Sequence, residues 1–140
     1  VYLHTNDIKL AKQLPEYCEM FNMVKEKPPR ITNSLRNEKY LYINDMKIII
    51  HNTPGHTEGG ISYQIGDNLF VGDTLFYDSI GRTDLPGGNI NQLINSLHKT
   101  IFTLDDNVKV YPGHGQNTTI GRERKNNPFI KKYFNKNDYN

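Results

Sequence analysis

The chain has 140 residues, enough for one domain with a modest hydrophobic core. Hydrophobic residues make up 36% and charged residues 23%, and the formal net charge of +2 is too small to indicate a nucleic-acid-binding protein. No apolar run approaches the roughly 20 residues of a membrane span, and the first ten residues are unlike a signal peptide. The chain has a single cysteine, Cys18, which fits a reducing compartment, so we expect a cytoplasmic protein. From the charge and the lack of a long apolar run we expect no nucleic-acid or membrane partner.

The N-terminal part is predicted to contain one short strand and one helix. Val1–Leu3 is typical of a strand, and Asn6 is an expected N-cap for a helix over Asp7–Phe21. Pro15 interrupts the helical pattern and is expected to split the helix in two. Loops are predicted over residues 25–30 and 33–39.

Two hairpins are predicted next in the chain. Tyr40–Ile43 and Met46–His51 flank an Asn44-Asp45 turn, which is a strong hairpin signal. Ile61–Ile65 and Leu69–Val71 flank a second turn that contains a glycine. A glycine-rich loop is expected over residues 78–88.

The C-terminal part is predicted to be mainly helical. Ile90–Ile101 carries apolar residues at the spacing of an amphipathic helix. A short strand, Val108–Tyr111, and a helix, Thr119–Asn126, follow, and the polar tail from Lys131 is expected to fray. This mixed order favours a layered α/β sandwich over a doubly wound parallel sheet.

Three strand ends carry side chains that can bind metals. Pro54-Gly55-His56 follows one predicted strand, Asp73 ends a second, and Pro112-Gly113-His114 follows a third. One such histidine is usually a surface or hydrogen-bonded residue, and one such aspartate is usually a turn or cap residue. Two Pro-Gly-His junctions with a strand-end aspartate between them are much less expected by chance. Imidazole and carboxylate together suit Zn, Fe or Mn.

The other histidines lack this setting. His51 precedes the first turn and is a candidate for supporting a ligand from behind. His98 lies beside the apolar stripe of the predicted helix, and a structural or solvated role is expected for it.

Five segments together resemble the metallo-β-lactamase-fold hydrolases, and the short glyoxalase II-like members above all. The segments are Thr53–Gly60, Gly72–Phe76, Ser79–Gly88, Tyr111–Gly115 and Thr118–Phe129, which reads TTIGRERKNNPF. Their order and spacing make the resemblance specific, and it spans nearly the whole chain. It implies an α/β fold, the αββα sandwich of that family, with a dinuclear metal site along one sheet edge.

The resemblance also implies the roles of the three strand-end residues. His56 would ligate one ion, Asp73 would bridge both ions as the catalytic residue, and His114 would ligate the second ion. The expected cofactors are two divalent metal ions, with Zn favoured over Fe or Mn. In such a site a metal-bound hydroxide acts as the nucleophile, and the expected substrate is a small-molecule thioester such as S-acylglutathione.

One motif of the family is absent from the sequence. No His-x-His-x-Asp-His is present, although the family carries it upstream of the segment that matches Val1–Phe21. We therefore expect residues 1–140 to be a single, N-terminally truncated domain, the C-terminal two-thirds of the fold. Alone it is expected to be inactive or to bind one ion weakly, and its uncovered core could promote self-association.

Arg82 is the candidate substrate-binding residue, because glyoxalase II has a basic residue near this point that contacts the glutathione carboxylate. An ion pair of Arg82 with Asp84 or Asp78 is an equally weighted alternative. Gly81-Arg82-Thr83-Asp84 is also shared with persulfide dioxygenases, which hold a single Fe(II) and would not use His114 as a ligand. A catalytically silent fragment is the third possibility.

Overall fold

The computed structural model describes residues 1–134, and the chain divides into two compact units, Val1–Glu38 and Lys39–Asn140. In the first unit, β1 (Tyr2–His4) pairs in parallel with β2 (Asn33–Leu35). The connection contains a 3-10 helix, η1 (Thr5–Asp7), and two short helices, α1 (Ile8–Lys12) and α2 (Leu14–Met20). The expectation of one domain over residues 1–140 stays a prediction.

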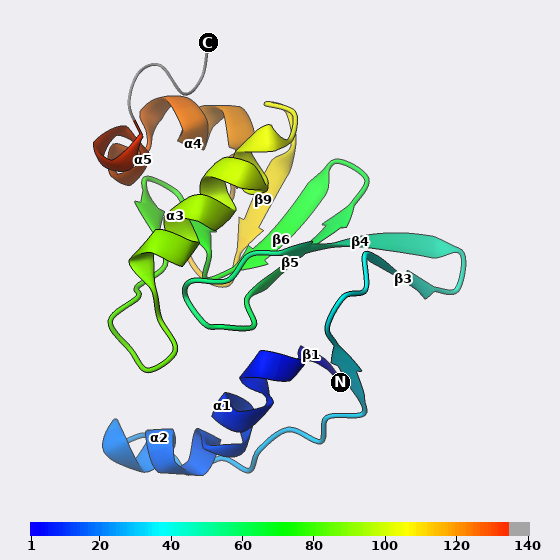
Figure 1. Ribbon diagram of the computed structural model, residues 1–140, viewed down its shortest axis with the longest axis vertical. Coiled ribbons are helices and arrows are strands. Elements are labelled where there is room, and N and C mark those ends of the chain that lie inside the picture. The colour runs from blue at the N-terminus through cyan, green and yellow to red at the C-terminus, as the bar shows by residue number, and fades with distance from the viewer. Residues whose placement is uncertain (135–140) are drawn as a thin grey trace. The chain divides into compact units, whose positions relative to one another are not determined.

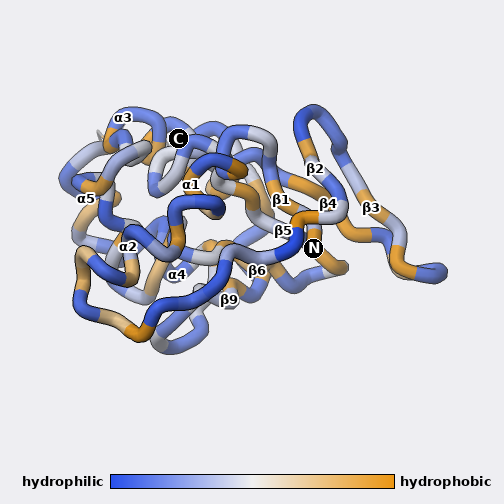
Figure 2. Tube along the Cα trace, turned by 90° about the horizontal axis from the view of Figure 1, so that it is seen from below, coloured by the Kyte–Doolittle hydropathy of each residue, from blue (hydrophilic) through white to orange (hydrophobic). Residues whose placement is uncertain are grey.

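The first unit confirms the split helix and corrects two details. Pro15 stands in the first turn of α2, where its missing N–H is tolerated, so the helix breaks at Gln13. Asn6 is not the N-cap, because its own N–H donates to the side chain of His4. Residues 33–35 form β2 rather than a loop, since their partner strand lies some thirty residues away and local polarity does not reveal it. The exposed stretch over residues 25–30 is mostly hydrophilic (Figure 2).

A six-stranded sheet forms the centre of the second unit, in the order β10-β9-β6-β5-β4-β3. Both predicted hairpins are confirmed: Ile43 pairs with Met46 and Ile65 pairs with Asn68. β6 and β9 are parallel neighbours, and every other pairing is antiparallel. The strands are β3 (Tyr40–Ile43), β4 (Met46–Asn52), β5 (Ile61–Ile65), β6 (Asn68–Gly72), β9 (Lys109–Pro112) and β10 (Thr118–Thr119).

A small ribbon and three helices complete the described part of this unit. Residues 79–80, predicted as loop, form β8 (Ser79–Ile80), which pairs with β7 (Leu75–Phe76). The predicted helices are confirmed as α3 (Ile90–Lys99) and α4 (Ile120–Asn126), with a 3-10 turn, η2 (Ile101–Thr103), after α3.

The polar tail is helical over part of its length, contrary to the expected fraying. Residues 131–133 belong to α5 (Pro128–Tyr133), which begins at a proline and is capped by the side chain of Asn127. The side-chain oxygen of Asn127 accepts from the backbone N–H groups of Phe129 and Ile130, and this cap outweighs the polar composition. Residues 135–140 of the tail lie outside the described residues.

The core of the second unit lies between one face of the sheet and the helices (Figure 1). Leu69 and Val110 are paired across β6 and β9, and both are fully buried. They belong to one cluster with Leu93 and Leu97 of α3, Ile120 of α4 and Ile130 of α5. Among the described residues, no helix is long and apolar enough to span a membrane.

Leu97→Ala is expected to lower the free energy of unfolding by about 3 kcal/mol, because Leu97 is fully buried and the mutation leaves a cavity between α3 and the sheet. Asn95→Ala, on the exposed side of the same helix, is the matched control and should change stability by less than about 0.5 kcal/mol. Urea denaturation followed by circular dichroism measures both. Equal effects of the two mutations would contradict the assigned core.

Candidate metal centre

The direction of three strands brings His56, Asp73 and His114 to one edge of the sheet. β6 and β9 are parallel, so the residues after Gly72 and after Pro112 emerge side by side. β4 is antiparallel to β5, which is antiparallel to β6, so β4 ends at the same edge. The three side chains predicted from the sequence are therefore together in the structure.

Both histidines face the same carboxylate oxygen. The Nε2 atom of His56 lies 3.8 Å from Oδ2 of Asp73, and Nε2 of His114 lies 3.7 Å from the same oxygen. These distances are too long for hydrogen bonds. Asp73 thus belongs to two pairs of potential ligands that share one oxygen atom.

The backbone of Arg82 fixes the tautomer of His56. Nδ1 of His56 lies 2.8 Å from the carbonyl oxygen of Arg82, which can only accept a hydrogen bond. Nδ1 therefore carries the proton, and in the neutral ring the lone pair of Nε2 points toward Asp73. A hydrogen bond of this kind commonly orients metal-binding histidines.

The side chains fit a divalent cation. Two imidazole nitrogens and a carboxylate oxygen are ligand atoms suited to Zn or Fe, and Nε2 of His56 and Oδ2 of Asp73 face each other without being hydrogen-bonded. No group of three or more His, Cys, Asp or Glu side chains is close enough to form a complete site among residues 1–134. Since zinc usually has four ligands, further donors are needed beside these three.

Two glycines leave room for Asp73. A Cβ atom on Gly113 would lie 2.5 Å from Oδ1 of Asp73, and one on Gly81 would overlap its carbonyl oxygen. The N–H of Gly113 donates to the carbonyl oxygen of Gly72 at 2.8 Å, which holds the two strand ends together. Any larger residue at position 81 or 113 would displace the carboxylate or its backbone.

A cleft of about 520 Å³ opens over these residues. Its lining consists of His56, Asp73, Phe76, Tyr77, Ser79, Ile80, Arg82, His114, Gly115 and Gln116.

Arg82 lies at this cleft, with its side chain paired to Asp84. Two parallel hydrogen bonds, each of 2.8 Å, join the guanidinium of Arg82 to the carboxylate of Asp84. These hydrogen bonds, together with one from the backbone, lower the pKa of Asp84 to about 2. Both side chains are mostly exposed, so solvent screens the pair strongly. Of the two partners expected for Arg82, the structure selects Asp84, because Asp78 pairs with Arg122 instead.

The residue predicted to support a ligand is engaged elsewhere. Nε2 of His51 lies 2.8 Å from the side-chain oxygen of Gln64, so this hydrogen bond goes to β5 rather than to one of the three candidate ligands. The supporting group that the sequence analysis missed is Phe76, whose ring stacks on His114 with a centroid distance of 4.5 Å. Phe76 carried no signal of its own, because an aromatic residue in a short apolar segment is usually part of the core.

The fold and the site define an α/β protein with candidate metal ligands at one edge of a sheet. The profile of the metallo-beta-lactamase superfamily matches residues 1–114. The chain belongs to this superfamily and has its α/β fold, of which it covers a part, so the predicted fold class is confirmed.

Individual relatives agree with the family. The chain is 36% identical over 126 residues to hydroxyacylglutathione hydrolase GloC of Haemophilus influenzae, a match that covers 86% of this chain and 58% of GloC. The crystal structure of BLEG-1 B3 metallo-beta-lactamase matches with a TM-score of 0.86 and 38% identity, over 94% of this chain and 65% of that one. TTHA1623 in a di-iron-bound form matches with a TM-score of 0.81 and 34% identity, over 92% and 64%. The chain spans about half the length of several other curated relatives.

Asp73→Asn is expected to weaken zinc binding by at least about 100-fold in the complete protein, because the neutral amide loses the charge shared by both histidines. The fold should survive, since the side chain of Asp73 is 35% exposed and supports no part of the core. Competition with a coloured zinc chelator measures the affinity. Asp67→Asn, in the exposed β5–β6 turn, is the matched control, and an unchanged affinity in Asp73→Asn would disprove the site.

Proposed function

We propose that the protein to which this chain belongs is a metal-dependent hydrolase that cleaves a thioester, S-acylglutathione or a similar small thiol ester. The observation that carries the proposal is the pair of histidines facing one oxygen of Asp73 at the mouth of a cleft. The name of GloC, hydroxyacylglutathione hydrolase, supports the substrate class at 36% identity.

In this proposal His56 and His114 would each hold one divalent ion, and Asp73 would hold both. Zinc is the favoured metal, with iron and manganese as alternatives, and TTHA1623 is a related protein with two irons. When bound, such ions lower the pKa of water and polarise a carbonyl group. The chain itself contributes the orientation: the hydrogen bond from Nδ1 of His56 to the Arg82 carbonyl oxygen turns Nε2 toward Asp73.

Arg82 is proposed to bind a carboxylate of the substrate. Its guanidinium lies at the cleft and already holds a carboxylate, that of Asp84, through two parallel hydrogen bonds. A substrate carboxylate would take the place of Asp84, which is exposed and free to turn into solvent. Because the pKa of Asp84 is about 2, this competition operates at every physiological pH.

Two other reactions are compatible with some of these features. The similarity to BLEG-1 B3 metallo-beta-lactamase makes hydrolysis of a β-lactam an alternative reaction. A persulfide dioxygenase would hold one iron without His114, whereas here His114 approaches Asp73 as closely as His56 does. The similar distances favour a site that uses both histidines.

The complete protein, loaded with zinc, is expected to hydrolyse S-lactoylglutathione with a kcat/KM above about 10⁴ M⁻¹s⁻¹ and to act far more slowly on a β-lactam. Ultraviolet absorbance of the thioester and of the lactam measures both, with Asp73→Asn as the inactive control. Metal analysis should find two equivalents. One equivalent of iron together with oxygen uptake on a glutathione persulfide would overturn the proposal in favour of the dioxygenase.

Arg82→Ala is expected to raise KM for the thioester by about 2- to 5-fold with little change in kcat, the size of an exposed ion pair. Asp84→Asn should lower KM, because it frees the guanidinium. Lys99→Ala, which removes an exposed charge from α3, is the control and should leave both constants unchanged. A fall in kcat at constant KM in Arg82→Ala would contradict a binding role.

A further inference from the structure

The two histidines of the candidate metal centre are held in different ways. The side chain of His56 is 27% exposed and hydrogen-bonded through Nδ1 to a backbone carbonyl. That of His114 is 72% exposed, and within the described part of the chain its ring makes no hydrogen bond through the second nitrogen. What lies against it is the ring of Phe76, nearly parallel at 26° and 4.5 Å away.

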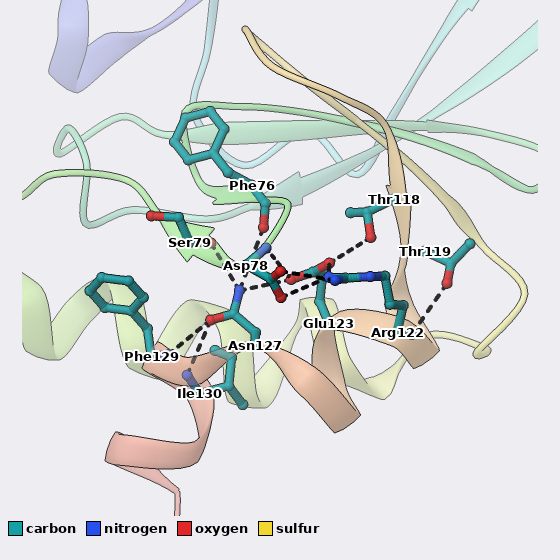
Figure 3. A network of polar contacts seen from close by, with 10 residues as sticks. All are labelled: Phe76, Asp78, Ser79, Thr118, Thr119, Arg122, Glu123, Asn127, Phe129 and Ile130. Atoms are coloured by element: carbon teal, nitrogen blue, oxygen red, sulfur yellow. Dashed lines mark hydrogen bonds and ion pairs between the residues drawn. The ribbon is translucent and has the colours of Figure 1, made fainter.

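Phe76 is placed by a tight turn that α4 and α5 hold from behind. The turn joins β7 to β8 and contains Asp78 with a φ of +55°, a left-handed conformation that is uncommon for aspartate. The N–H of Asp78 donates to Oε2 of Glu123 at 2.9 Å. The amide of Asn127 donates to the carbonyl oxygen of Ser79 at 3.0 Å and to Oε2 of Glu123 at 2.9 Å (Figure 3).

The side chain of Asp78 is tied to the same helix. Two hydrogen bonds of 2.9 Å join it to the guanidinium of Arg122, and they lower the pKa of Asp78. The guanidinium also lies over the ring of Tyr77, 3.3 Å from its centroid. Both middle residues of the turn are therefore held by Arg122.

Glu123 connects this turn to the segment that carries His114. Its other oxygen, Oε1, accepts from the hydroxyl of Thr118 at 2.6 Å and from Arg122 at 2.5 Å. Thr118 lies in β10 and pairs with Val110 of β9, so the loop between these strands contains His114. One carboxylate thus holds both the turn of Phe76 and the base of the His114 loop.

Glu123 is fully buried, and a buried carboxylate is costly unless donors surround it. Four donors do so here, two on each oxygen: Asp78 N–H, Asn127, Thr118 and Arg122. An apolar residue could fill the same space without this requirement. The carboxylate adds hydrogen bonds that tie the turn after Phe76 to the base of the His114 loop, and the side chains of Phe76 and His114 stack in the cleft.

We propose that Phe76 is a positioning residue for His114, and that Glu123 keeps the two in register by binding the turn of one and the loop base of the other. The proposal rests on the metal centre proposed above. It assigns the orientation of His56 to a hydrogen bond and that of His114 to an aromatic stack. Loss of the stack should therefore weaken one metal position and leave the other unchanged.

Phe76→Leu tests the stack, because leucine keeps an apolar side chain and removes the ring. In the metal-free complete protein, nuclear magnetic resonance should show an upfield ring-current shift of the His114 ring protons in the wild type and its loss in Phe76→Leu. Zinc titration against a chelator should show the affinity of one of the two metal positions lowered by about 10-fold and that of the other unchanged. Phe76→Tyr keeps an aromatic ring and should retain both the ring-current shift and the wild-type zinc affinity. Phe129 is an exposed phenylalanine of α5, and Phe129→Leu is the matched control.

Glu123→Gln and Thr118→Val test the connection. The first change puts an amide donor where the surrounding groups are themselves donors, and the second removes the hydroxyl without changing the shape of residue 118. Both variants should reduce the ring-current shift of His114. If Glu123→Gln does not fold, the shift in Thr118→Val tests the role of Glu123. Unchanged His114 signals in the folded variants would overturn the role of Glu123.

The outcomes for the two proposals are distinct. Fewer than two zinc ions in the wild type would overturn the proposed metal centre. Two zinc ions in the wild type with identical affinities in Phe76→Leu would overturn only the positioning role. Equal weakening of both positions in Phe76→Leu would do the same, because a selective effect is what the stack predicts.

Discussion

The common direction of β4, β6 and β9 is the constraint on which the candidate site depends. Because the three strands run the same way, their C-terminal ends meet at one sheet edge, and each needs only a short turn to present a candidate metal ligand. β9 can lie parallel to β6 only if the chain crosses over between them, and α3 belongs to that crossover. Burial of Leu93 and Leu97 against the sheet therefore fixes the same geometry that brings His114 to Asp73.

Close approach at this edge is possible because small residues stand where chains meet. Gly81 and Gly113 lie against the backbone and the carboxylate of Asp73, and neither position has room for a Cβ atom. The polar groups behind the edge are satisfied in turn by the buried carboxylate of Glu123. The core thus fixes the direction of the strands, and the glycines allow their ends to approach closely. Glu123 holds the segments that emerge from these ends.

The sequence predicted what local patterns encode and missed what long-range pairing decides. Alternation and turn residues identified both hairpins, and the apolar spacing of α3 identified its buried face. The strand-end positions of His56, Asp73 and His114 marked them as candidate metal ligands, and the resemblance to the metallo-β-lactamase fold implied that they meet at one sheet edge. β2 was missed because its hydrogen bonds go to a strand far along the chain, and α5 because a single side-chain cap outweighs a polar composition. Phe76 was missed for a similar reason, since its partner is thirty-eight residues away.

In the proposed function, Arg82 serves the metal centre and the substrate through separate groups. Its carbonyl oxygen orients His56, and that contact belongs to the backbone, so it does not depend on the identity of the side chain. Its guanidinium extends to the exposed side of the cleft, where Asp84 holds it in a carboxylate-binding geometry. The backbone role requires the residue to stay in place, whereas the side-chain role requires it to exchange partners. An exposed pair meets both needs, because solvent screening keeps the interaction weak enough to exchange while the backbone hydrogen bond stays intact.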